Sequence, residues 1–314
     1  MTEHENTQRL INLESPAIKS ILNILLQDKT TKQNIIWATD AYIDHGPEFS
    51  DKAQIKPSAF TGYMPIVLQP RIEKAIDEQQ KRTKKKAEVF TPVWVCNYMN
   101  NVCDEEWFGR KNVFNTENDD HSWTVTENEI AFPEGKNWKQ YIDSRRLEIT
   151  CGEAPYLVSR YDAATGQLIL PPKRRIGLLD RKLRIVDENT TDEEEWLKWA
   201  LRAFQASYGY EYQGDNLLIA RVNLMMTFDD YYRERWSKEP ALADLKKIAN
   251  VVAWNIWQMD GLTDSVPLGK PGKIHEQLSL FDSEDNEENE PAPFCKIRDW
   301  RADKSVTFVS LKER

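Results

Sequence analysis

The chain has 314 residues with a formal net charge of −9, and 40% of its residues are hydrophobic and 11% aromatic. This composition supports a sizeable core and excludes wholesale disorder, while the length suggests about two domains or one large α/β domain with an added segment. No apolar run approaches the roughly 20 residues of a membrane helix, and no signal segment is visible at the start, so we expect a soluble cytoplasmic protein.

The first predicted element is an N-terminal helix. Ser15 is a typical N-cap and Pro16 suits the first helical position. Four apolar residues then share one face of a helix that ends near Gln27: Ile18, Ile21, Leu22 and Leu25. A second helix with a basic end is expected over residues 70–86. Residues 1–86 are therefore predicted to form a mainly helical N-terminal region.

Strands and helices alternate in the middle of the sequence. After loops with short strands over 110–140, β-prone runs follow at residues 146–151, 175–186 and 208–212. Helices are expected from the capping box of Thr191 and Glu194, over 216–228, and from 242 onward. This alternation predicts an α/β fold with a parallel sheet.

Charge is segregated along the chain. Residues 81–86 read KRTKKK, and residues 282–290 read DSEDNEENE. The acidic run lies in a polar, Pro-containing segment, so residues 263–293 are predicted to be a flexible acidic linker before a short strand segment over 294–314. Since binding depends on local patches, the negative total does not exclude a nucleic-acid partner.

Four stretches carry candidate chemistry. The first is Phe90-Thr91-Pro92, where Thr91 can cap a helix and Pro92 suits its first turn; taken alone, an ordinary helix start is the simpler explanation. The second runs from Glu148 to Leu157, where a strand ends in an acid and a Gly-containing turn lets backbone approach a ligand.

The third and fourth stretches are acids at the ends of later strands. Glu211 follows Tyr208-Gly209-Tyr210, and an acid in this position commonly hydrogen-bonds ribose hydroxyls. Asp260 follows the apolar run that begins at Asn255.

Together, in this order, the stretches resemble the adenine-N6 DNA methyltransferases and modification (M) subunits of restriction–modification systems, over about residues 80–262. The resemblance implies a Rossmann-like core over residues 87–262 that binds S-adenosylmethionine. The cofactor residues that it implies are Phe90, Thr91, Pro92, Glu148, Cys151, Gly152, Tyr156, Glu211 and Asp260. In the family's D-P-x-x-G-x-G-x-F-L loop, Glu148 here replaces the Asp, Ile149 the Pro and Ala154 the second Gly.

One family signature is missing. The (N/D)PP(Y/F) tetrapeptide, which accepts the exocyclic amine and stacks on the flipped base, does not occur in the sequence. Asp299 and Trp300 are the nearest candidates by order for the catalytic acceptor and stacking ring. Only 14 residues follow Trp300, so we expect the core to be incomplete, and a second modification or specificity subunit is a predicted partner.

Two peripheral runs suggest further partners. Five basic residues shortly before Phe90 are candidates for DNA phosphate contacts or simply a solvated helix end: Lys81, Arg82, Lys84, Lys85 and Lys86. Within the linker, a QLSLF peptide resembles the motif that binds the bacterial sliding clamp; the alternative is that its apolar side chains fold back onto their own domain. Its candidate contacts are Gln277, Leu278, Leu280 and Phe281.

The leading hypothesis is therefore a DNA methyltransferase-like subunit that uses S-adenosylmethionine in a restriction–modification, defence or mobile-element system. The alternative is a catalytically inactive protein of the same fold that binds DNA or a protein partner, with the sliding clamp as one candidate. Four Cys, none in CxxC spacing, and four His predict neither a disulfide framework nor a metal site.

Overall fold

The computed structural model describes residues 10–61, 65–74, 91–269 and 291–312. At its centre is a three-stranded parallel sheet in the order β3-β4-β5. The strands are β3 (Arg146–Glu148), β4 (Ser207–Glu211) and β5 (Ile256–Gln258). Leu147 pairs with Tyr208, and Tyr210 with Trp257. The prediction of helices combined with a parallel sheet is confirmed.

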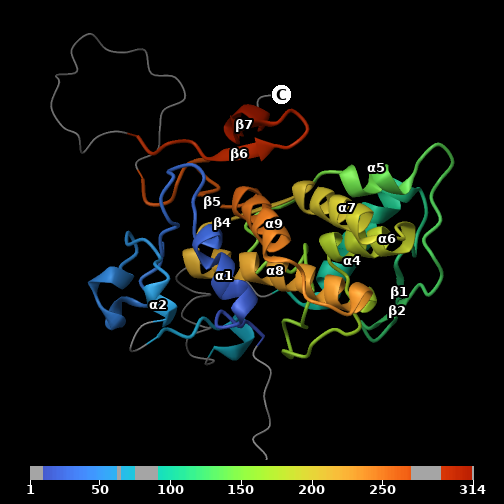
Figure 1. Cartoon of the computed structure of the whole chain (residues 1–314), viewed down its shortest axis with the longest axis horizontal. Helices are drawn as coiled ribbons and strands as arrows, with labels where there is room; N and C mark the ends of the chain where they lie inside the picture. The colour runs from blue at the N-terminus through green and yellow to red at the C-terminus, as the bar shows by residue number, and fades with distance from the viewer. Residues whose placement is uncertain (1–9, 62–64, 75–90, 270–290, 313–314) are drawn as a thin grey trace, which may run out of the picture.

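Helices cover one face of this sheet (Figure 1). The connection from β3 to β4 contains α6 (Leu178–Asn189) and α7 (Glu193–Gln205), and the connection from β4 to β5 contains α8 (Gly214–Trp236) and α9 (Leu242–Asn255). With α1 (Pro16–Leu25) they bury one continuous hydrophobic core. Such burial is the main favourable term in folding.

A C-terminal hairpin covers the other face. Strands β6 (Lys296–Asp299) and β7 (Lys304–Thr307) pair antiparallel, and the short helix α10 (Val309–Lys312) follows. Successive strand residues point to opposite faces, so Tyr208, Tyr210 and Trp257 pack against this hairpin rather than against the helices. Both strands lie within residues 294–314, which the sequence predicts as a strand segment, and the helix α10 lies there as well.

The remaining elements surround this centre. They are α2 (Ser58–Thr61), α4 (Val93–Phe108), α5 (Trp138–Asp143), and the hairpin of β1 (Asn115–Glu117) with β2 (Trp123–Val125). Short 3-10 turns occur at Ile43–His45, Pro47–Phe49, Arg71–Glu73 and Pro172–Arg174.

The N-terminal helix α1 forms as predicted. The hydroxyl of Ser15 accepts a hydrogen bond from the Ile18 N–H, and the four predicted apolar residues are buried. The described residues of the N-terminal region belong to the same core as the sheet and its helices. Beyond α1 and α2, the described part of this region consists of turns and extended segments, and the described part of the helix predicted from residue 70 is a 3-10 turn.

Three local predictions are wrong. The segment 175–186 is not a strand, because from Leu178 onward it forms helix α6, whose buried face includes charged side chains that pair inside the protein. Asp192, not Thr191, caps α7 by accepting from the Glu195 N–H. Helix α4 begins at Val93 after Pro92, so Thr91 does not cap it.

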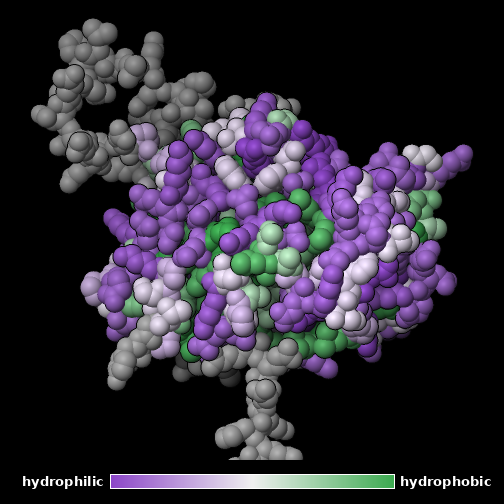
Figure 2. Space-filling view, viewed as in Figure 1, coloured by the Kyte–Doolittle hydropathy of each residue, from purple (hydrophilic) through white to green (hydrophobic). Residues whose placement is uncertain are grey.

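The visible surface in Figure 2 is mostly hydrophilic, including over β6 and β7, and hydrophobic residues show chiefly around α8 and α9. Among the helices of the described residues, none combines the length and apolar character needed to cross a membrane.

Candidate functional site

The predicted acids meet at the carboxyl edge of the parallel sheet. Glu148 is the last residue of β3, Glu211 is the last residue of β4, and Asp260 lies just beyond β5. Because β4 pairs in parallel with both neighbours, their carboxyl ends coincide. Glu211 links the three: its Oε2 accepts from the Gly152 N–H at 2.9 Å, and its backbone oxygen accepts from the Met259 N–H at 3.0 Å.

The loop after β3 folds tightly over this edge. Thr150, Gly152 and Ala154 have φ angles of 47°, 53° and 65°, in the left-handed region that costs energy for residues other than Gly. A Cβ at Gly209 would lie 3.2 Å from the Cys151 sulfur, so a glycine in β4 permits the close approach of the loop. Within the loop, the Cys151 N–H donates to the Tyr210 backbone oxygen at 2.8 Å and the Ala154 N–H donates to the Cys151 backbone oxygen at 2.7 Å, so these backbone donors fasten the loop to β4 and to itself.

The carboxyl of Glu148 holds the far end of the loop. Its Oε1 accepts from the Tyr156 N–H at 3.3 Å and its Oε2 from the Leu157 N–H at 3.1 Å. Glu211 similarly accepts from the Gln213 N–H at 3.1 Å. Both glutamates therefore organise backbone at the carboxyl edge.

Burial controls the protonation of both glutamates. Desolvation raises the pKa of Glu148 to about 8, although its two backbone hydrogen bonds oppose the shift. Desolvation also raises the pKa of Glu211 to about 7. Burial, with Glu148 and Glu211 nearby, raises the pKa of the Cys151 thiol well above its ordinary value. Cys151 is thus a packing residue rather than a nucleophile.

The start of α4 reaches the same loop. Burial raises the pKa of the Tyr156 hydroxyl, and a hydrogen bond with the Thr91 side chain partly offsets the shift. About two helical turns beyond the half-buried Pro92, the Asn100 side chain donates to the backbone oxygens of Tyr156 at 3.0 Å and Ile176 at 2.9 Å. The structure therefore brings Thr91 and helix α4 into contact with the loop after β3, while Pro92 is the residue directly before the helix.

Asp260 is the most accessible of the three acids. It is half-buried, and its Oδ1 accepts from the Leu262 N–H at 2.9 Å. Among the described residues no hydrogen bond to its Oδ2 occurs, so this oxygen is available to accept from a ligand.

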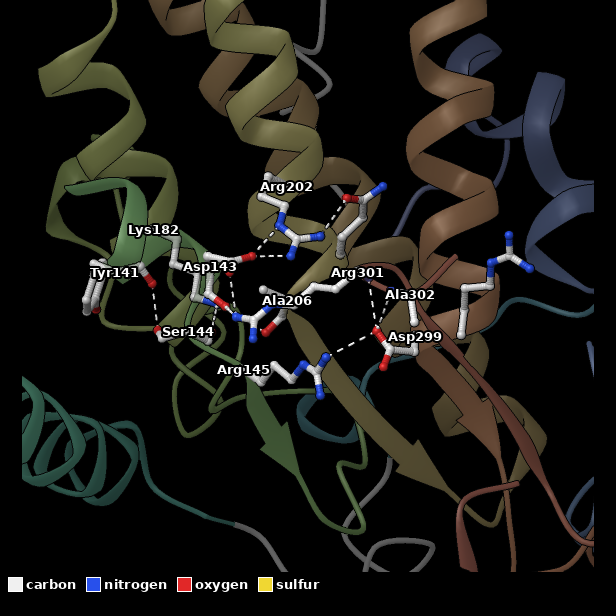
Figure 3. Close-up of polar contacts among 12 residues, drawn as sticks. Tyr141, Asp143, Ser144, Arg145, Lys182, Arg202, Ala206, Asp299, Arg301 and Ala302 are labelled. Atoms are coloured by element: carbon white, nitrogen blue, oxygen red, sulfur yellow. Dashed lines mark hydrogen bonds and ion pairs between the residues drawn. The ribbon is translucent and has the colours of Figure 1, made fainter. Parts of the chain in front are cut away.

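Asp299 and Trp300 are not part of this cluster. They lie at the amino edge of the sheet, since Asp299 Oδ1 accepts from Arg145 Nη2 at 3.1 Å just before β3 (Figure 3). Trp300 Nε1 donates to the Asn255 side chain just before β5. Hydrogen bonds from the backbone of Ala302 and Arg301, with Arg145 nearby, lower the pKa of Asp299. The β6 strand crosses the sheet from its carboxyl edge, where Cys295 Sγ donates to the Gln258 backbone oxygen, to this opposite end.

Several predicted residues lie outside the described part of the chain. They are Phe90, the basic residues Lys81, Arg82, Lys84, Lys85 and Lys86, and the clamp-peptide residues Gln277, Leu278, Leu280 and Phe281.

Sequence reasoning missed the role of α4. This helix buries a polar stripe of Asn97, Asn100 and Asp104, whereas Trp94 and Tyr98 are 39% and 52% exposed. The sequence does contain a signal, because these polar residues recur at helical spacing. An amphipathic helix usually buries its apolar stripe, whereas α4 buries this polar one. A helix that buries amides and an acid must have polar partners in the protein, here including the loop after β3.

No family model matches the sequence, and comparisons with curated proteins and with solved structures find no match either. Within the described ranges, no group of three or more His, Cys, Asp or Glu side chains is arranged to hold a metal ion.

Proposed function

We propose that the chain binds S-adenosylmethionine at the carboxyl edge of the β3-β4-β5 sheet, as a DNA adenine-N6 methyltransferase-like subunit of a restriction–modification, defence or mobile-element system. One observation carries the proposal. The loop after β3, Glu211 and Asp260 follow three neighbouring parallel strands, with the order along the chain equal to the order in the sheet. In open α/β sheets, ligands bind outside the carboxyl ends of the strands.

The residues present fit a nucleoside cofactor. A carboxylate oxygen has room for two acceptor contacts, so Glu211 can accept from ribose hydroxyls while keeping Gly152 and Gln213. Asp260 Oδ2 can accept from an adenine amine, and Thr91 and Tyr156 border the loop. The bound cofactor would supply an electrophilic methyl group; this chain's contribution is to bind and orient it.

Binding can be tested without catalysis by titrating the full chain with S-adenosylmethionine and with its demethylated product in a calorimeter. Asp260→Asn should weaken binding by about 1–3 kcal/mol, the cost of a charge-assisted hydrogen bond. Asp260 is preferable to Glu211 for this test because Glu211 also holds backbone in place.

The matched control is Asp303→Asn, which removes a carboxyl that is 85% exposed near β7 and should leave the affinity unchanged. Folded wild-type protein that releases no heat with millimolar ligand would eliminate the cofactor proposal.

The alternative is a catalytically inactive protein of this type that binds DNA or a partner such as the sliding clamp. The position of Asp299 and Trp300 favours this alternative. Asp299 and Trp300 lie at the opposite end of the sheet from Glu211 and Asp260, and Asp299 already accepts from Arg145 and two backbone N–H groups. The base-holding groups would then come from another chain or be missing.

We therefore predict that the isolated chain transfers little tritiated methyl from S-adenosylmethionine to mixed-sequence DNA. Robust transfer by the single chain, abolished in Asp299→Ala but kept in Asp303→Ala, would contradict this prediction and make Asp299 a catalytic residue.

A further inference from the structure

A groove at the amino edge of the sheet is not used by the proposed cofactor site. It has a volume of about 640 Å³ and runs between α5 and α7, with Lys139, Lys198 and Trp199 among its lining residues. Arg202 and Gln205 of the groove also border a narrow crevice beside Arg145, Arg301 and Trp300, which has no room for a water molecule. The side chains around the crevice therefore extend the charged border of the groove but not its volume.

The surface formed by the groove and its border is positively charged in a chain whose total charge is negative. Its cations come from α5, from α7, from the residue before β3 and from the turn after β6. They are Lys139, Lys198, Arg202, Arg145 and Arg301. Because these residues are far apart in the sequence, the fold rather than a basic run concentrates the charge here.

Two carboxylates offset part of this charge. Asp143 forms ion pairs with Arg202 and with Arg301, whose Nη2 lies 2.5 Å from Asp143 Oδ2. Asp299 forms an ion pair with Arg145 (Figure 3). Five cations against two carboxylates leave an excess of three positive charges. A guanidinium has five N–H donors, so the paired arginines keep donors for a ligand.

Aromatic rings are interleaved with the cations. Lys139 Nζ lies 5.2 Å from the ring centroids of both Trp138 and Trp199, which themselves pack 4.8 Å apart. Of these two rings, Trp199 lines the groove. Alternating cations and aromatic faces along a groove are how proteins bind single-stranded nucleic acid, through phosphates and stacked bases.

We propose that this groove binds single-stranded nucleic acid, with Lys139, Lys198 and Arg202 contacting phosphates and Trp199 stacking on a base. A single phosphate would fill only a small part of the volume, and an acidic peptide would make no use of the rings. The site lies at the opposite end of the sheet from Glu211 and does not depend on cofactor binding.

The test is fluorescence anisotropy of a labelled single-stranded oligonucleotide with the full chain, without S-adenosylmethionine, over a series of salt concentrations. Lys139→Glu with Lys198→Glu should weaken binding by roughly ten-fold or more at low salt. The dependence of log affinity on log salt should also become shallower, by about 0.7 for each phosphate that the protein no longer neutralises.

Lys52→Glu with Lys56→Glu is the matched control, because it makes the same change in net charge at exposed positions that precede α2 in the sequence. Figure 1 shows α2 on the other side of the molecule from α5 and α7. Circular dichroism would verify that both variants are folded. Equal weakening in both variants, absence of wild-type binding, or equally tight binding of a labelled polyglutamate would overturn the proposal.

Discussion

At the residue scale, the two buried glutamates couple the candidate site to pH. Glu148 and Glu211 each accept two backbone N–H bonds, yet desolvation still places their pKa values at about 8 and about 7. The charge of Glu211 adds to the upward shift at Glu148. The two carboxyls therefore titrate as a coupled pair around neutral pH.

The raised pKa values determine whether the protein gains or loses stability as the pH rises. The folded pKa values lie above the value of about 4.3 for an unperturbed Glu, so folding takes up protons. The resulting stability is fully present below the unfolded pKa and is lost as the pH rises through 7 and 8. Each unit of pKa difference corresponds to about 1.4 kcal/mol.

We predict that Glu148→Gln makes the free energy of unfolding less dependent on pH between about 6 and 9, measured by urea denaturation. The variant should also be less stable than wild type at about pH 6, because an amide offers one acceptor oxygen where the carboxyl offers two. Glu134→Gln, at an exposed position, should keep the wild-type pH dependence. An unchanged pH slope in Glu148→Gln would show that Glu148 is ionised in the folded protein at neutral pH.

At the scale of elements, α4 and α6 show where sequence patterns fail. Asp104 of α4 and Arg181 of α6 are each 1% exposed and form an ion pair of 2.6 Å. The Tyr141 hydroxyl of α5 donates to the other Asp104 oxygen at 2.9 Å. In a sequence, charged residues are normally taken as surface residues. The buried face of α6 includes charged residues, and for this reason the segment is wrongly predicted as a strand.

Removing one charge of that pair should be costly. Asp104→Asn leaves the Arg181 guanidinium buried without its carboxylate, so we predict a loss of about 3–5 kcal/mol in the free energy of unfolding. Glu105→Gln makes the same chemical change one residue along α4, in an exposed pair with Lys111, and should cost less than about 1 kcal/mol. Similar losses in the two variants would mean that the Asp104 pair is solvated in solution.

At the scale of the whole molecule, the N-terminal segment is built into the core. The fully buried Arg221 of α8 donates to the backbone oxygens of Leu25 and Gln27 and also to that of Ile256. The Gly214 N–H donates to the Trp37 backbone oxygen at 2.8 Å. These contacts join segments distant in sequence, which no local pattern could predict.

The predictions that succeeded rest on local sequence patterns, and those that failed depend on contacts between distant segments. Elements with a regular apolar stripe, such as α1, and strand ends marked by an acid, such as Glu211, are predictable because their signals are local. Asp299 lies at the amino edge of the sheet, opposite to Glu211, because of the direction in which β6 crosses the sheet. That direction cannot be predicted from the order of the motifs along the chain.

The C-terminal hairpin has a consequence for the order of folding. Tyr208, Tyr210 and Trp257 form an aromatic surface on the sheet, and β6 and β7, which cover it, are synthesised after all three parallel strands. During translation this surface is exposed to water and to other chains until Ile297 and Phe308 leave the ribosome. Nascent chains should therefore be prone to aggregate after the three parallel strands have emerged and before β6 and β7 do, when the helical face is complete and the aromatic face is still bare.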